Sequence, residues 1–157
     1  MQNLAPKASS RISLNGSLLA ATMGIFFLVI SFRLEMLTSN PILVFQLVAA
    51  IPLFLTSNLS YSKIAYRDDI KNWNRLAWIT FILGYSFLLN VIGVLCSKIF
   101  GLSFGVLFFV FSWVLSIVYS IVDIGSDKHF LNERIFKTLF FVLIQSFLGL
   151  FLVFGIF

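Results

Sequence analysis

The chain has 157 residues, of which 60% are hydrophobic, 17% aromatic and only 11% charged, and its formal net charge is +5. About a quarter of the residues in a soluble globular domain are charged, so this composition excludes a soluble catalytic domain and indicates an integral membrane protein. The single cysteine, Cys96, excludes an intrachain disulfide and a cysteine-cluster metal site, and the single histidine, His129, excludes paired histidine ligands. We therefore expect no metal and no other cofactor.

Long apolar runs predict an all-α, polytopic membrane protein with five transmembrane helices in one membrane domain. A helix needs about 20 apolar residues, at about 1.5 Å per residue, to cross about 30 Å of hydrocarbon. The five runs cover residues 17–37, 41–57, 76–97, 102–123 and 135–157. The second run is the shortest and contains Pro52, which removes a backbone donor and favours a kinked helix or a re-entrant segment. A re-entrant second segment would leave four crossings.

Two of the connections between these runs are short. Thr38, Ser39 and Asn40 before Pro41 are typical of a tight turn with a helix cap and a proline at the first helical position. Residues 98–101 predict a similar turn. The other two connections, 58–75 and 124–134, are longer and polar, so short and long connections alternate between the two sides of the membrane.

The distribution of Lys and Arg predicts the orientation of the chain, because cytoplasmic connections are enriched in these residues. With five crossings, Arg33 and Lys98 lie on one side. The side of the amino terminus holds the other nine: Lys7, Arg11, Lys63, Arg67, Lys71, Arg75, Lys128, Arg134 and Lys137. We therefore expect the amino terminus inside and the carboxyl terminus outside, in an inner or plasma membrane, with an organelle membrane as the alternative.

The fourth run carries small and polar residues along one face. At about 100° per residue, the residues that share this face with Gly105 are Ser112, Ser116, Tyr119, Ser120 and Asp123. Close packing against a neighbouring helix is one interpretation, with the serine hydroxyls bonded to carbonyls one turn back. The alternative is a polar path for an ion or a small solute, with Asp123 attracting cations at its cytoplasmic mouth.

The second, third and fifth runs each carry one strong amide: Gln46, Asn90 and Gln145. A polar group buried in hydrocarbon costs free energy, so each amide requires a partner, a cavity or a function. Hydrogen bonds between helices, worth about 0.6 kcal/mol each, are one interpretation. A pocket of neutral donors and acceptors for a small solute is the other.

Small residues predict where helices approach each other closely. Gly16, Ala20 and Gly24 follow one another at intervals of four in the first run, and Gly101 and Gly105 open the fourth. Such residues allow two helix backbones to come together in a membrane. We expect them to be helix-packing and assembly faces.

The 58–75 segment is predicted to be a cytoplasmic, interfacial segment with a basic stripe. Its basic residues lie four apart, at Lys63, Arg67, Lys71 and Arg75, with Tyr61, Tyr66 and Trp73 between them. Anionic lipid headgroups are the natural partner, at about 1 kcal/mol per basic residue. The alternative is a simple orientation signal beside an aromatic belt. Four basic residues beside the membrane make too small a footprint for nucleic acid, which we do not expect as a partner.

No complete catalytic set is present in the sequence. Asp68 and Asp69 form the only carboxylate pair, which offers fewer oxygen ligands than a metal-dependent lipid enzyme needs. Residues 101–105 match the G-x-S-x-G pattern of hydrolases, but no strand is expected before Ser103, and His129 is predicted on the opposite side of the membrane. We therefore expect that the protein is not an enzyme, and a lipid-modifying activity is the least favoured function.

These observations favour a non-catalytic membrane subunit that assembles with itself or with another membrane protein. The alternative is an oligomeric channel or carrier for an ion or small solute, lined by the serine face of the fourth run and the three amides. Five short helices barely enclose a pocket alone, so both functions predict an oligomer.

Overall fold

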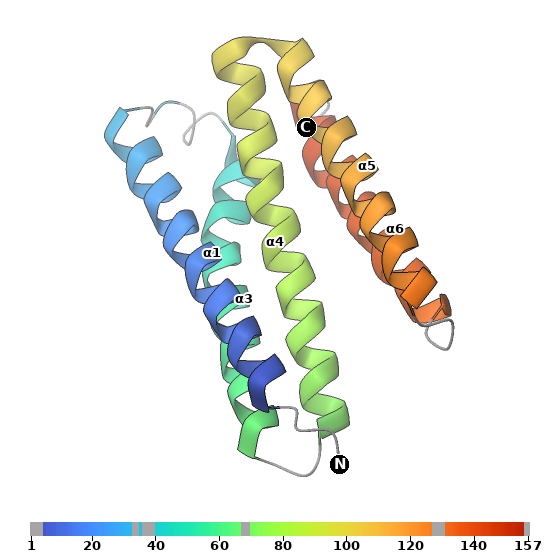
Figure 1. The fold of residues 1–157 in the computed structure, drawn as a ribbon. Coiled ribbons are helices and arrows are strands. Elements are labelled where there is room, and N and C mark those ends of the chain that lie inside the picture. The colour runs from blue at the N-terminus through green and yellow to red at the C-terminus, as the bar shows by residue number, and fades with distance from the viewer. Residues whose placement is uncertain (1–4, 33–34, 36–39, 67–69, 127–130, 156–157) are drawn as a thin grey trace. The chain divides into compact units, whose positions relative to one another are not determined.

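The computed structural model describes residues 5–32, 35, 40–66, 70–126 and 131–155. Their regular elements are all helical, which confirms the predicted all-α class (Figure 1). In chain order these elements are α1 (Ala5–Phe32), α3 (Pro41–Tyr66), α4 (Ile70–Phe100), α5 (Leu102–Ser126), α6 (Leu131–Gln145), the π-helix η2 (Ser146–Leu150) and α7 (Phe151–Val153).

Within the described residues, five helical segments are long and apolar enough to cross a membrane, as predicted. They cover Ser9–Ser31, Pro41–Ile64, Lys71–Phe100, Leu102–Val122 and Arg134–Val153. The second segment is longer than the apolar run suggested, because α3 continues without interruption past the exposed Pro52 to Tyr66. All five segments therefore have the length of a full crossing.

Helix boundaries follow the predicted signals at two connections. Asn40 precedes α3, and its side-chain Oδ1 accepts a hydrogen bond from the backbone N–H of Leu43 at 3.1 Å, so the predicted cap is confirmed. Between α4 and α5 the turn is reduced to Gly101, whose φ of 103° is readily accessible only to glycine. The N–H of Gly101 donates to the carbonyl of Ser97 at 3.0 Å, which closes the end of α4.

The chain divides into two compact units, residues 1–88 and residues 89–157, and α4 belongs partly to each. In the 1–88 unit, α1 packs along α3 (Figure 1). The first part of α4 packs on α3 where Gly84 meets Leu53 and Phe54, and the Phe54 and Phe81 rings meet edge to face with centroids 6.4 Å apart. The core of this unit includes the fully buried Leu47, Ala50, Phe54 and Ala77.

In the 89–157 unit, the last part of α4 packs against α5 at two glycines. A Cβ built on Gly105 would lie 2.5 Å from the Cβ of Ser97, and one built on Gly93 would lie 2.6 Å from the Phe109 ring. Helix α5 also packs along α6 (Figure 1). Phe109 is the fully buried centre of this unit.

Candidate functional site

Two carboxamide side chains are buried in the 89–157 unit. Asn90, on α4, and Gln145, the last residue of α6, are both 0% exposed. The nitrogen and the oxygen of each carboxamide have no hydrogen-bond partner among the described residues. Because buried polar groups in proteins are almost always paired, these two side chains mark the candidate site.

Gly149 places the two amides in one neighbourhood. A Cβ built on Gly149 would collide with Oδ1 of Asn90, and it would lie 2.6 Å from the Phe109 ring. The Asn90 amide therefore lies directly against the backbone of η2. Gln145 lies four residues before Gly149, about one helical turn away on the same face.

The backbone changes its hydrogen-bonding pattern at this site. The π-helix η2 begins at the residue after Gln145 and includes Gly149. The N–H of Phe151 donates to the carbonyl of Ser146, five residues back rather than four. Such single π-turns inside α-helices are frequent at functional sites.

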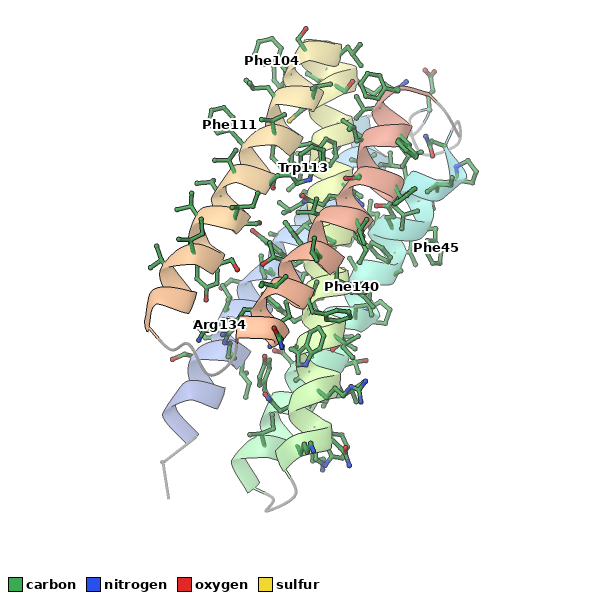
Figure 2. The ribbon with its side chains drawn as sticks, turned by 90° about the vertical axis from the view of Figure 1, so that its right-hand side faces the viewer. Phe45, Phe104, Phe111, Trp113, Arg134 and Phe140 are labelled. Atoms are coloured by element: carbon green, nitrogen blue, oxygen red, sulfur yellow. The ribbon has the colours of Figure 1, made fainter. Side chains whose placement is uncertain are left out.

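Trp113 adds a third unpaired polar group to this unit. Its indole Nε1 is buried and has no hydrogen-bond partner among the described residues. Trp113 follows Phe109 by one turn of α5, on the same face. Figure 2 shows Phe104 and Phe111 pointing away from the helices, whereas Trp113 points toward the neighbouring helices.

The 1–88 unit contains a second polar cluster, in which Nδ2 of Asn15 and the Ser57 hydroxyl are paired, whereas Oδ1 of Asn15 has no partner among the described residues. Nδ2 of Asn15 on α1 donates to Oγ of Ser57 on α3 at 2.8 Å, and the Ser57 hydroxyl donates to the carbonyl of Ala77 on α4 at 2.9 Å. Asn15 and Ser57 are both fully buried. This connection across three helices was not predicted from the sequence, although Asn15, Thr22 and Val29 recur at intervals of seven on the buried face of α1.

The remaining predicted pocket residues lie in both units. Gln46 is fully buried in the 1–88 unit. The three serines of α5 are half-buried, whereas Val114 and Val118 of the same helix are exposed. Tyr119, which was predicted on the serine face, is 68% exposed, so that face is only partly covered by protein. Asp123 belongs to α5, but its side chain lies outside the described residues.

The predicted packing glycines have different surroundings. Gly105 packs against Ser97 within the α4–α5 hairpin. Gly101 is required by its positive φ and not by a close helix contact. Gly16 and Gly24 differ from both, because a Cβ built on either would meet nothing within 4 Å. Ala20, between them, is exposed.

The basic stripe is described in part. Lys63, Lys71 and Arg75 are exposed, and Arg67 lies outside the described residues, as do Asp68, Asp69 and His129. Of the aromatic residues of this segment, the structure describes the side chains of Tyr61 and Trp73, and both are less exposed than the described basic ones. Tyr61 is buried with Ile64 and Ala77, and Trp73 packs against that cluster.

Within the described part of the chain, no three His, Cys, Asp or Glu side chains lie close enough together to hold a metal ion. Comparison with protein-family models, with curated proteins and with solved structures finds no match.

Proposed function

We propose that this chain is a non-catalytic, multi-pass membrane subunit that assembles through one face of α1, with a second copy of itself or with another membrane protein. The face consists of Gly16, Ala20 and Gly24, together with the exposed Ser13 and Ser17 beside them. We refer to it as the α1 small-residue face.

The contrast between glycines carries this proposal. Glycine in a helix costs up to about 1 kcal/mol relative to alanine. At Gly84, Gly93, Gly105 and Gly149 the absent Cβ allows a close contact within the chain. Gly16 and Gly24 have no such neighbour, so contacts within the described chain do not explain them. A close approach by another helix does.

The other face of α1 is already occupied. Asn15, Thr22 and Val29 are buried, and at about 100° per residue they lie about 160° around the helix from Ala20. The hydrogen bond from Asn15 to Ser57 holds this buried face against α3. The α1 small-residue face is thereby directed away from α3, where a partner helix has access to it.

The association test uses two neighbouring alanines as a matched pair. Ala20→Leu and Gly24→Leu should weaken self-association in lipid nanodiscs about tenfold, equivalent to about 1.4 kcal/mol, because a bulky side chain keeps the backbones apart. Ala21→Leu adds the same bulk at an exposed position about 100° from Ala20 and should leave association unchanged. Energy transfer between labelled copies, measured over a range of protein-to-lipid ratios, reports the association.

Two results would contradict this function. If all three variants associate equally, the α1 small-residue face is not the interface. If the wild-type chain stays monomeric, self-assembly is wrong. Assembly with another membrane protein is then tested by placing a photocrosslinking residue at position 24 in native membranes. A crosslinked product supports that assembly, and its absence contradicts it.

The exposed basic residues support a second contact, with the membrane surface. Lys63, Lys71 and Arg75 project from the adjoining ends of α3 and α4. We propose that they contact anionic headgroups on the cytoplasmic face.

The half-buried serine face of α5 favours one alternative function, a channel or carrier for an ion or small solute. Its serines, Ser112, Ser116 and Ser120, are less exposed than Val114 and Val118 of the same helix. The same preparation in liposomes separates the two functions. A solute flux that Ser116→Leu abolishes favours the channel, whereas absence of flux for several ions and neutral solutes favours the subunit.

A further inference from the structure

We propose that Asn90 and Gln145 form a binding site, inside the 89–157 unit, for a small uncharged molecule that both donates and accepts hydrogen bonds. The site is separate from the α1 small-residue face, and it does not depend on assembly. Its ligand is either water or a small neutral solute of the same hydrogen-bonding chemistry.

The unpaired atoms are the reason to expect a ligand. Both carboxamides are 0% exposed, and all four of their polar side-chain atoms have no partner among the described residues. Each such group costs about 1–3 kcal/mol when it is left unsatisfied. Inside a bilayer no bulk water relieves that cost, so a bound molecule that pairs with these atoms stabilises the unit.

The chemistry of the site selects an uncharged ligand with both hydrogen-bonding roles. Each carboxamide offers an N–H₂ donor beside a carbonyl acceptor. The groups shown to contact this neighbourhood, the Phe109 ring and Gly149, carry no charge. An ionic ligand would remain uncompensated in hydrocarbon, whereas a neutral molecule with a donor and an acceptor matches both amides.

Packing limits the size of the ligand. The Phe109 ring occupies the space that side chains at Gly93 and Gly149 would need, and Asn90 lies against Gly149. Little room remains beside the amides, so the ligand is of the size of water or of a small amide. One buried water typically makes about three hydrogen bonds, which would pair most of the four atoms.

The test observes the two amides directly, in the full-length chain in lipid nanodiscs. With ¹⁵N in the Asn and Gln side chains, nuclear magnetic resonance detects each N–H₂ group, and Asn90→Leu and Gln145→Leu identify the two signals. One arm measures magnetisation transfer from water to these groups. The other titrates acetamide, a neutral donor and acceptor, and follows the shifts of the same signals.

Either source of ligand gives a distinct positive result. Transfer from water to both N–H₂ groups, without a saturable response to acetamide, identifies water. A saturable shift of both signals by acetamide identifies a solute site. Asn15 is the internal comparison, because its Nδ2 already donates to Ser57 while its Oδ1 has no partner among the described residues, so its signal should shift less than those of Asn90 and Gln145.

A steric variant tests the location of the site. Gly149→Ala places a methyl group against Asn90 Oδ1 and the Phe109 ring, so it should abolish the water transfer or weaken acetamide binding at least tenfold. Gly84→Ala is the matched control, because a Cβ there would lie 3.2 Å from Leu53 in the other unit, and it should leave both signals unchanged.

The wild-type spectrum alone decides the proposal if Gly149→Ala does not fold. The proposal is overturned if neither magnetisation transfer from water nor a saturable shift by acetamide is observed. The two amides would then be buried side chains that bind no ligand. Shifts of all amide signals in linear proportion to acetamide also contradict a solute site. Self-association of the Asn90→Leu variant should match that of the wild type, so failure of this proposal is distinguishable from failure of the proposed subunit function.

Discussion

At the scale of single residues, buried polar groups are partly paired in the 1–88 unit, where Oδ1 of Asn15, Oδ1 of Asn58 and the Ser86 hydroxyl have no partner among the described residues. In the 1–88 unit the Ser57 hydroxyl is both acceptor and donor, and it connects α1, α3 and α4 through Asn15 and the Ala77 carbonyl. In the 89–157 unit Asn90 and Gln145 are equally buried but have no partners among the described residues. Neither polar atom of Asn90 or of Gln145 is paired, whereas Nδ2 of Asn15 is, so we place the structural connection at Ser57 and the candidate binding site at the two amides.

Two buried serines of α3 allow a direct test of that structural connection. Ser57→Ala removes the partner of Asn15, so we expect the free energy of unfolding to fall by about 1–3 kcal/mol. The Ser60 hydroxyl donates only to the Thr56 carbonyl of its own helix, at 2.8 Å, so Ser60→Ala should change the free energy by less than about 0.5 kcal/mol. Reversible unfolding in mixed micelles measures both, and equal effects would contradict a bridging role for Ser57.

At the scale of elements, the ends of the helices depend on particular residues. Asn40 caps α3, and Pro41 occupies a position where no backbone donor is required. A single glycine, Gly101, separates α4 from α5. The hairpin therefore depends on the conformation of one residue, which must adopt a φ of 103°.

Substitution of Gly101 tests this dependence. Gly101→Ala forces a Cβ into a conformation that costs an L-residue about 1–2 kcal/mol, so the unfolding free energy should fall by that amount. The space around Gly101 is open, with nothing within 4 Å of a built Cβ, so the loss would come from the backbone and not from a clash. Ser103→Ala, at an exposed position in the first turn of α5, should have almost no effect, and the same micelle unfolding experiment measures both variants.

At the scale of the whole molecule, the described residues include five helices long and apolar enough to cross a membrane, and five crossings predict that the two ends of the chain lie on opposite sides of it. The bias of Lys and Arg predicts which side is cytoplasmic. This orientation also predicts that the exposed Lys63, Lys71 and Arg75 lie at the cytoplasmic surface, where anionic lipids are available.

Cysteine labelling tests the orientation. In a Cys96→Ser background, single cysteines replace Asn40, Ser62 and Ser126 in turn. A membrane-impermeant reagent added to intact cells should label only position 40, because the other two positions are predicted to be cytoplasmic. Labelling after permeabilisation shows that each cysteine is reactive. External labelling at position 62 would reverse the predicted orientation.

The sequence by itself determined the class of the protein and the number of membrane-length helices in its described residues. Apolar runs of this length have no soluble alternative, so five membrane-length helices could be predicted from hydropathy alone. Local signals were equally informative, because a cap such as Asn40 acts on the backbone within three residues. The composition also directed attention to Gln46, Asn90 and Gln145, since a strong amide within an apolar run is costly wherever it points.

Only the tertiary structure decided which of these polar groups are paired and which glycines have neighbours. The bond between Asn15 and Ser57 joins residues 42 positions apart, and no local pattern indicates it. Likewise Gly24 and Gly149 look alike in the sequence, yet one is open and the other lies against Asn90 and Phe109. The physical reason is that pairing and close packing depend on how separate helices dock, whereas hydropathy and capping are properties of one segment at a time.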